Sequence, residues 1–346
     1  MPTCAIVSFR LGGSDGVSVV AATWAAALHS FGFDIVTVAG DGPVDRVVRG
    51  LGLAPDAQAV ALDDTVHDAL ADADLVVVEN LCTIPLNLPA ARSVARSLKG
   101  RPAVLHHHDP AWQRAHFAAI TELPPVDAAW RHVTINELTQ REFAARGIDA
   151  TLIYNGFDPN PRHGDRAATR EFLRVTSDER LVVHPVRAIP RKNVPAAIRL
   201  AEQLDATYWL VGPAEDGYDD ELQRLLDAAR CRVIQLTTPG DMSDVYAAAD
   251  VIAFPSTWEG FGNPPIEGAL HRRPVAVGHY PVAEELRSKF GFEWFEPDGA
   301  AALDRFLHAP DEALLDRNHR IAVDHFSTTR MTQDLRALLD DAGWLP

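Results

Sequence analysis

The sequence predicts an α/β fold with two doubly wound domains, in each of which helices cover both faces of a parallel sheet. Short apolar runs alternate with longer amphipathic segments, which is the pattern of repeated β-α units. The alternation breaks once, at the proline-, glycine- and asparagine-rich stretch LIYNGFDPNPRHGDR (152–166), and then restarts. A chain of 346 residues, of which 47% are hydrophobic, is long enough to fill two cores. We therefore expect one domain over residues 1–157, a second over 158–325 and a C-terminal helix over 326–346.

Each predicted strand is a short run of apolar residues, as in parallel strands that are buried on both faces. In the first half the strands are CAIVSF, DIVTVAG, DLVVVEN and AVLHHH. In the second half they are RLVVHPV, TYWLVGP, CRVIQL, DVIAFPS and PVAVGH. The segment VSVVAATWAAALHSFG predicts a helix that ends at Gly32, and TTRMTQDLRALLDDAGWLP predicts the amphipathic C-terminal helix.

Composition excludes several classes of protein. The formal net charge is −16, and no basic run is longer than two residues, so we expect neither nucleic acid nor an anionic membrane surface as a partner. The sequence has no apolar stretch of transmembrane length, and its N-terminus lacks the pattern of a signal peptide. The three cysteines are far apart and form no metal or disulfide pattern. We expect a cytoplasmic protein with reduced thiols.

The stretch STWEGFGNPPIEGAL (256–270) follows a predicted strand, at the end where ligands bind in α/β sheets. Gly260 and Gly262 permit close approach of the backbone to an anion, and two adjacent prolines suit the first turn of a helix. Glu259 precedes this turn, and we expect Glu267 in the first turn of the helix. A nucleoside diphosphate sugar would match the pattern, because carboxylates accept hydrogen bonds from sugar hydroxyls and the helix N-terminus attracts phosphate. The alternative is a surface loop in which Glu267 is only a helix N-terminal charge.

Two cations follow another predicted strand, in HPVRAIPRKNV (184–194). Arg187 and Lys192 flank a short turn and could clamp a diphosphate, while the direction of Arg191 is left open. A solvated basic loop is the alternative. Near the N-terminus, Gly12 and Gly13 lie in a loop between a strand and a helix, without the spacing of a dinucleotide fingerprint.

Polar residues also end two strands of the first half. The run HHHD contains His108 and Asp109, and because neighbouring strand residues point to opposite faces, one functional histidine is favoured over a metal site. A carboxylate partner could orient His108, and Asp109 is its neighbour in the sequence. Glu79 and Asn80 end the preceding strand, and Asn136 is expected to cap a helix.

Taken in order, these residues resemble the retaining glycosyltransferases of family 4, which have the GT-B fold. The family pattern E-x7-E is matched by Glu259 and Glu267, its diphosphate-binding pair by Arg187 and Lys192, and its strand-end HD by His108 and Asp109. Its first-loop glycines correspond to Gly12 and Gly13, and its interdomain NG-x-D to Asn155, Gly156 and Asp158. Two departures from the pattern are Val186 and Asn193, which replace glycines.

The resemblance implies a domain for the acceptor, a domain for the nucleotide sugar, and a tail helix that returns to the first domain. It implies that Glu267 holds the ribose and that Glu259 holds the sugar. It further implies that sugar and phosphate are positioned by Gly260, Phe261, Gly262 and Asn263. By the same resemblance, His108 touches the reaction centre. Asn80, Asp109 and Asn155 are expected near the acceptor. UDP is the expected nucleotide, no metal or other cofactor is required, and retention of configuration is expected.

The acceptor is the least defined part of this hypothesis. The first predicted helix contains no lysine or arginine and so offers no basic surface for a membrane phospholipid. We therefore expect the acceptor to be a soluble metabolite or oligosaccharide, for example in the tailoring of an oligosaccharide antibiotic. A sugar-nucleotide 2-epimerase of the same fold and a non-catalytic nucleotide-sugar sensor remain alternatives. An NAD-dependent dehydrogenase would need the glycine fingerprint that the first loop lacks.

Overall fold

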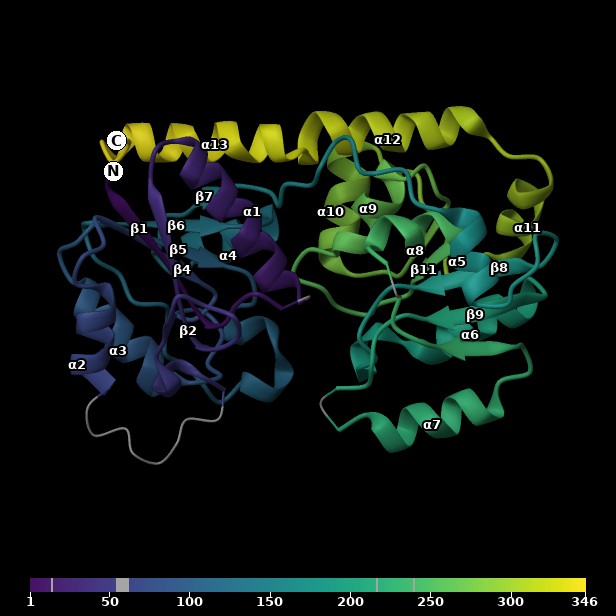
Figure 1. The fold of residues 1–346 in the computed structure, drawn as a ribbon, viewed down its shortest axis with the longest axis horizontal. Helices are drawn as coiled ribbons and strands as arrows, with labels where there is room; N and C mark the ends of the chain where they lie inside the picture. Colours follow the sequence, from purple (N-terminus) through teal and green to yellow (C-terminus); the bar gives the residue numbers. More distant parts are fainter. Residues whose placement is uncertain (14, 54–61, 216, 239) are drawn as a thin grey trace. The chain divides into compact units, whose positions relative to one another are not determined.

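The computed structural model describes residues 1–13, 15–53, 62–215, 217–238 and 240–346 (Figure 1). The chain divides into two compact units. Unit 1 consists of Met1–Gly156 together with Thr328–Pro346, and unit 2 consists of Phe157–Ser327. The C-terminal segment thus packs within the same unit as the N-terminus, and both chain ends lie in unit 1 (Figure 1).

The sheet of unit 1 is parallel, with the order β3-β2-β1-β4-β5-β6-β7. The chain turns in opposite directions from β1, so the order of the strands reverses between β1 and β4, where open α/β sheets bind their ligands. The strands are β1 (Thr3–Arg10), β2 (Asp34–Asp41), β3 (Arg46–Val47), β4 (Leu75–Glu79), β5 (Ala103–His107), β6 (Trp130–Thr134) and β7 (Thr151–Leu152).

Two apolar cores lie on the two faces of this sheet. In β1, Cys4 and Ile6 join the core under α1 and α13, while Ala5 and Val7 join the core under α2 and α3. This alternation follows from the two-residue period of a strand. The helices are α1 (Gly16–Ser30), α2 (Leu62–Leu70), α3 (Leu88–Leu98), α4 (Glu137–Ala144) and α13 (Thr328–Asp341), with 3-10 turns at Arg49–Leu51, Ala111–Gln113 and Ala115–Phe117.

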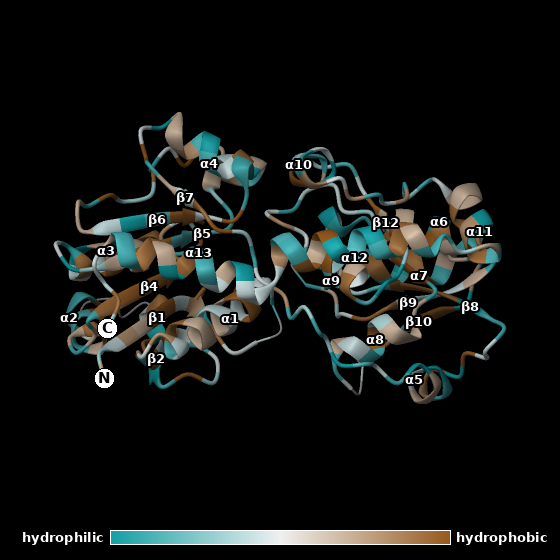
Figure 2. Cartoon of the chain, turned by 90° about the horizontal axis from the view of Figure 1, so that it is seen from above, coloured by the Kyte–Doolittle hydropathy of each residue, from teal (hydrophilic) through white to brown (hydrophobic). Residues whose placement is uncertain are grey.

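Unit 2 repeats the same plan with the parallel order β10-β9-β8-β11-β12. Here the strand order reverses between β8 and β11. Its strands are β8 (Arg180–His184), β9 (Ala206–Leu210), β10 (Val233–Gln235), β11 (Val251–Phe254) and β12 (Val275–Val277). Its helices are α5 (Arg166–Phe172), α6 (Val194–Gln203), α7 (Asp219–Ala228), α8 (Met242–Ala248), α9 (Asn263–Leu270), α10 (Pro281–Phe290), α11 (Ala300–His308) and α12 (Glu312–Phe326), with a 3-10 turn at Pro190–Lys192. Strands such as β1 and β4 in unit 1 and β9 in unit 2 are hydrophobic, while β6 and helices such as α4 carry hydrophilic residues (Figure 2).

These observations confirm the predicted fold class of two doubly wound α/β units. Gly32 has a positive φ of 105° directly after α1, as expected for a helix C-terminus. Asn136 caps α4, because its side-chain oxygen accepts a hydrogen bond from the backbone N–H of Thr139 at 2.7 Å. All three cysteines are free thiols. Within the described ranges, no helix combines the length and apolar character needed to cross a membrane.

Candidate active site

The loops that follow β8 and β11 lie side by side at the carboxyl edge of the unit 2 sheet. These strands are neighbours on either side of the reversal in strand order. The backbone N–H of Thr257 donates to the carbonyl of Arg191 at 2.9 Å, and the side chain of Asn193 donates to the carbonyl of Pro255 at 3.2 Å. The two sequence stretches singled out above therefore form one continuous surface.

Glu259 lies at the centre of this surface and is held by two cations. Lys192 Nζ donates to its Oε1 at 2.6 Å, and Arg191 donates to its Oε2. Only 5% of Glu259 is exposed. Burial alone would raise the pKa of Glu259, but the charges of Lys192 and Arg191 and the hydrogen bond from Lys192 lower it to about 2. Glu259 is therefore a carboxylate at neutral pH.

The electrostatics of Lys192 follow from the same pairing. Burial lowers the pKa of Lys192, and the carboxylate of Glu259 opposes that effect. Beneath it, His184 is fully buried and accepts or donates a hydrogen bond with the hydroxyl of Tyr208 at 2.9 Å. Burial, together with the charge of Lys192, lowers the pKa of His184 to about 3, so this ring is neutral at physiological pH. Positive charge is in excess among Arg191, Lys192 and Glu259.

Helix α9 begins at Asn263, four residues after Glu259. Its N-cap, Gly262, has a φ of 97°, and a Cβ at this position would collide with the hydroxyl of Tyr280. Pro264 and Pro265 occupy the first turn as predicted, and because they lack N–H groups, Asn263 and Ile266 are the only donors of that turn. The helix therefore attracts an anion mainly through the positive end of its dipole.

Glu267 lies in the second turn of α9, and the expectation of the first turn was wrong by one residue, because the helix begins at Asn263. Tyr246 donates its hydroxyl proton to Glu267 Oε2 at 2.5 Å, and the Tyr246 ring stacks on His271. Burial raises the pKa of Glu267, and the hydrogen bond from Tyr246 partly opposes this. Tyr246 thus fixes one carboxyl oxygen, and the other, which has no hydrogen-bond partner among the described residues, is left as an acceptor for a ligand.

Arg187 is directed differently from Lys192. It forms an ion pair with Glu215, in the segment that follows β9. The two segments are joined by backbone hydrogen bonds, from Ala188 N–H to the carbonyl of Pro213 at 2.7 Å and from Gly212 N–H to the carbonyl of Val186 at 3.1 Å. A Cβ on Gly212 would collide with that carbonyl, so the glycine that permits close approach here is Gly212, opposite Val186. To bind a diphosphate, the Arg187 guanidinium must either contact the phosphate while it stays paired with Glu215, or break this ion pair.

The backbone loop of the E-x7-E stretch is also anchored by its aromatic residue. Phe261 is buried and its ring centroid lies 6.1 Å from that of Phe157 and 5.9 Å from that of Phe326. Gly260 and Asn263 are partly buried beside it. Phe261 therefore acts as an anchor of the loop, and its expected contact with a ligand stays a prediction.

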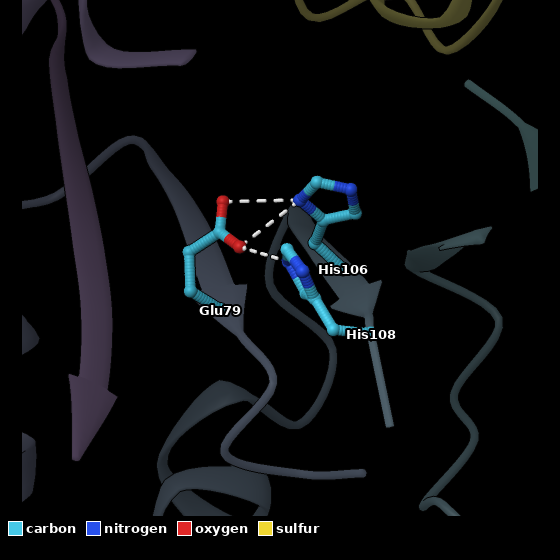
Figure 3. Close-up of side chains that lie close together, drawn as sticks. All are labelled: Glu79, His106 and His108. Atoms are coloured by element: carbon cyan, nitrogen blue, oxygen red, sulfur yellow. Dashed lines mark hydrogen bonds and ion pairs between the residues drawn. The ribbon is translucent and has the colours of Figure 1, made fainter. Parts of the chain in front are cut away.

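In unit 1, three side chains converge at the ends of β4 and β5 (Figure 3). His106 Nδ1 lies 3.1 Å and 3.0 Å from the two oxygens of Glu79, and His108 Nε2 lies 2.8 Å from Oε2. Burial would raise the pKa of Glu79, but its electrostatic interaction with His106 and the hydrogen bonds from His106 and His108 lower it to about 2. The donor atoms of the three residues lie within 4.8 Å of one another, so this group has the composition of a possible metal centre. The same contacts are those of two imidazoles that donate to one carboxylate.

His107 points to the opposite face of the sheet, as the strand period predicts. Its Nδ1 contacts the hydroxyl of Thr83 at 2.5 Å and its Nε2 contacts His132 at 2.9 Å. Burial, with the nearby His132, lowers the pKa of His107 well below its usual value. It is a neutral residue of the interior and not part of the group around Glu79.

The carboxylate that orients His108 is Glu79 and not Asp109. Asp109 forms an ion pair with Arg114, because the chain turns away after β5. The side-chain oxygen of Asn80 accepts from the backbone N–H groups of both His108 and Asp109 at 3.1 Å. Asn80 therefore fixes the backbone beneath His108, and an acceptor contact from Asn80 or Asp109 stays a prediction.

The remaining predicted residues of unit 1 lie in two other loops. Gly12 and Gly13 are exposed in the loop between β1 and α1, and Asn155 is buried after β7. The structure thus groups Arg191, Lys192 and Glu259 in unit 2, and Glu79, His106 and His108 in unit 1. Glu267 lies farther along α9, where it contacts Tyr246. Sequence reasoning left Arg191 undecided and missed Tyr246, His106 and the role of Glu79.

Comparison with known proteins places these features in a family context. Residues 187–304 match the family described as glycosyl transferases group 1. A mannosylglucosylglycerate synthase from Petrotoga mobilis is 24% identical over 88% of this chain and 88% of its own length. A D-inositol 3-phosphate glycosyltransferase from Mycobacterium tuberculosis is 35% identical over 35% of this chain and 28% of its own length.

Solved structures show the same architecture. The structure of HepE from Anabaena in complex with UDP and glucose superposes with a TM-score of 0.78 at 20% identity, covering 98% of this chain and all of that chain. A sucrose-phosphate synthase from Thermosynechococcus elongatus superposes with a TM-score of 0.72 at 16% identity, covering 99% of both chains. The fold is thus GT-B, with two Rossmann-like domains. Residues 187–304 are thus similar to the group 1 glycosyl transferases, and both relatives carry names of enzymes that form glycosides.

Proposed function

We propose that the chain is a retaining glycosyltransferase that moves a sugar from a nucleoside diphosphate donor to a hydroxyl of a soluble small-molecule or oligosaccharide acceptor, without a metal. The observation that carries the proposal is Glu259, a buried carboxylate held by Lys192 and Arg191 at the N-terminus of α9. Glu267 follows at the E-x7-E spacing, inside the segment that matches the family.

The donor is assigned from this surface and from the neighbouring structures. HepE binds UDP, UDP-glucose and glucose in its crystal structures, which favours a UDP-sugar here. In our proposal the free oxygen of Glu267 accepts from the ribose hydroxyls, while Glu259 faces the sugar. The diphosphate lies against Lys192, Arg191 and the positive end of α9. A contact of Gly12 and Gly13 with the donor stays a prediction.

The reaction needs positive charge where the leaving group forms. As the bond between the anomeric carbon and the phosphate oxygen breaks, negative charge grows on the diphosphate and the sugar acquires oxocarbenium character. Lys192 and Arg191 stabilise that charge through fixed ion-pair geometry, which is the role a divalent metal plays in other transferases. We propose retention, with the acceptor hydroxyl attacking on the face that the diphosphate leaves.

The acceptor is proposed only by class. The names of the relatives specify a sugar acid derivative and an inositol phosphate, both small and rich in hydroxyls. These names favour a small polar acceptor over a membrane lipid, and they give no support to an oligosaccharide antibiotic in particular. Glucosylglycerate-type acids and inositol phosphates are therefore the first acceptors to assay.

A nucleotide panel tests the proposal. The chain is melted with UDP, GDP, ADP and dTDP in buffer that contains a chelator, and sugar nucleotides of the stabilising base are then assayed for transfer. Stabilisation by one nucleotide and an α-configured product from an α-configured donor are expected. Conversion of the donor to its epimer would favour the epimerase, and nucleotide binding without any turnover of donor would favour the sensor. Absence of stabilisation by all four nucleotides contradicts the proposal.

A further inference from the structure

Glu79, His106 and His108 form a buried group at the carboxyl edge of the unit 1 sheet, and their two histidines differ in environment. The side chain of His106 is 0% exposed and that of His108 is 6% exposed. His106 stacks on Trp24 of α1, with ring centroids 4.1 Å apart and planes inclined by 25°. His108 has its backbone N–H fixed by Asn80 and its ring centroid 4.5 Å from that of His106. The inner ring is thus immobilised by packing, and the outer ring is the one that a ligand can reach.

The hydrogen bonds determine which nitrogen of each ring carries the proton. An ionised carboxylate only accepts hydrogen bonds, so each nitrogen that contacts Glu79 must donate. His106 therefore carries its proton on Nδ1, and its Nε2 is buried and has no partner within the described part of the chain. A neutral His106 leaves a lone pair there, whereas a protonated one would bury an unpaired N–H. Burial also lowers the pKa of His106, in agreement with the neutral form.

His108 must likewise donate from Nε2 to Glu79, as the dashed line in Figure 3 indicates. Its Nδ1 then carries the lone pair, and this nitrogen has no hydrogen-bond partner among the residues that the structure describes. Unlike His106 Nε2, it does not belong to the fully buried unpaired atoms. The arrangement is that of a carboxylate–imidazole pair, in which the carboxylate fixes the tautomer and leaves the second nitrogen to the substrate.

We infer that Glu79 is a positioning residue for His108. Glu79 is itself held by His106, which stacks on Trp24. It fixes the Nε2–H tautomer of His108, so that Nδ1 accepts a hydrogen bond from a substrate hydroxyl. This inference rests on the proposed function for the identity of the substrate. It assigns roles that the sequence pattern did not, since the adjacent Asp109 is committed to Arg114.

Other charged and titratable groups around His108 leave this assignment intact. His107 points to the other face and contacts Thr83 and His132. Glu79 receives hydrogen bonds at its carboxylate from His106 and His108 within the described residues, and the hydroxyl of Ser8 donates to its backbone carbonyl at 2.9 Å. The carboxylate is therefore dedicated to the two rings.

A metal ion is the competing occupant of the same three side chains. A metal-bound histidine usually donates its second N–H to a protein partner, which fixes the ligand. Among the residues that the structure describes, His106 Nε2 lacks such a partner, and one nitrogen of each histidine already lies at hydrogen-bonding distance from Glu79. These contacts favour protons over a cation, and metal content is one outcome of the test.

The test compares E79Q, H108A and the double variant E79Q/H108A by steady-state transfer. E79Q is expected to lower kcat by about 10- to 100-fold, the range usual when the partner that orients a metal-bound histidine is lost. Nucleotide affinity should not change, because the nucleotide is proposed to bind to unit 2. If Glu79 acts through His108, E79Q costs no further activity once His108 is absent. E79D, which keeps the charge, is expected to recover part of the loss.

The matched control is T83V, which removes a buried hydrogen bond to a histidine of the same strand on the opposite face of the sheet. Both T83V and E79Q should lower the melting temperature, because each removes a buried hydrogen bond. T83V should leave kcat unchanged. Equal loss of kcat in T83V, or losses that multiply in the double variant, would overturn the inference. Stoichiometric metal in the purified protein, with loss of activity on chelation, would also overturn it.

A spectroscopic arm separates this inference from the proposed function. In protein labelled with ¹⁵N-histidine, the His108 signal is identified by its absence in H108A. At mildly alkaline pH it should report a protonated Nε2 and an unprotonated Nδ1, and E79Q should abolish that preference. This readout requires no turnover. An Nδ1–H tautomer in the unmodified chain contradicts the inference, even if transfer is demonstrated. An Nε2–H tautomer in a chain without transferase activity supports the inference and contradicts only the proposed function.

Discussion

At the scale of single residues, the donor surface depends on charges that are buried together. Glu259 keeps its negative charge because Lys192 and Arg191 compensate for burial, and the Glu259 carboxylate, 2.6 Å from Lys192, opposes the lowering of the Lys192 pKa by burial. Removing one member of such a group leaves the others buried without a partner, which is usually more costly than replacing the whole group. The group is therefore fixed before any ligand arrives, as stabilisation of a transition state requires.

Replacement of Glu259 by glutamine tests this arrangement. E259Q keeps the shape of the side chain but leaves two cations facing a neutral amide, so the sugar loses its partner and both cations lose their geometry. We expect transfer to fall by about 10²- to 10³-fold in kcat, comparable to the loss of a preorganised electrostatic partner. The measurement is the transfer rate at saturating donor.

The control for E259Q is E202Q. Glu202 forms an ion pair with Arg230 at 2.8 Å near the end of α6, at the other edge of the unit 2 sheet. This variant also removes a paired carboxylate from unit 2, and its transfer rate should equal that of the unmodified chain. Similar losses in E259Q and E202Q would mean that Glu259 is a structural residue.

Sequence reasoning reached some of these residues and not others, for a physical reason. Sequence reasoning found Glu259, Glu267 and Lys192 because neighbouring residues predict their local structure, a glycine turn after a strand and the start of a helix. The pairing of Arg191 with Glu259 links positions 68 residues apart, and only the neighbouring positions of β8 and β11 bring them together. The same holds for Glu79, whose partner His106 is its register neighbour across β4 and β5.

At the scale of elements, the start of α9 depends on a backbone conformation that only glycine adopts readily. Gly262 combines a φ of 97° with close packing against Tyr280 and Phe254. We expect G262A to destabilise the chain by about 1–3 kcal/mol through backbone strain, and to weaken nucleotide binding because the helix N-terminus moves. Urea unfolding and calorimetric titration with UDP measure the two effects.

Gly16 supplies the control for this substitution. It begins α1, its backbone is not in the left-handed region, and a Cβ there meets no atom within 4 Å. G16A should be neutral or slightly stabilising, since alanine is the better helix former. If G262A matched G16A in both stability and nucleotide affinity, the conformation at the start of α9 would be irrelevant to binding.

Prediction of the elements from sequence succeeded where the apolar pattern was strong. The buried strands β1, β4, β8 and β11 were all identified from their short apolar runs. The expected start of α9 lay too close to Glu267, whereas the helix begins at Asn263. Two adjacent prolines both suit the first turn of a helix, so the sequence does not decide which residue begins it. Helix ends are set by capping contacts, and here the cap is a glycine with no side chain to reveal it.

At the scale of the whole molecule, buried ionisable groups predict a specific loss of stability in acid. The pKa of Glu79 and of Glu259 is about 2 in the folded chain against 4.5 ordinarily. The unfolded chain then binds more protons, so the stability that these carboxylates contribute is complete above pH 4.5 and is lost as the pH falls towards 2. His184, with a pKa of about 3 against 6.5, acts with the same sign from pH 6.5 downward.

We therefore expect the free energy of unfolding to begin falling below pH 6.5 and to fall more steeply below 4.5. Glu267 acts in the opposite direction, because its raised pKa favours the protonated folded form as the pH falls. Urea unfolding across this range measures the sum. In E79Q the slope between pH 4.5 and 2 should be shallower than in the unmodified chain. Constant stability between pH 6.5 and 4.5 would contradict the account.

The central claim is that a nucleoside diphosphate is bound without a metal by Lys192, Arg191 and the N-terminus of α9. The most direct measurement is a crystal structure of the chain with a UDP-sugar, grown in the presence of a chelator. The account predicts both phosphorus atoms beside the Lys192 ammonium group and the start of α9, with the ribose hydroxyls on Glu267. Phosphates elsewhere on the chain, or a complex that forms only when a divalent cation is supplied, would contradict it.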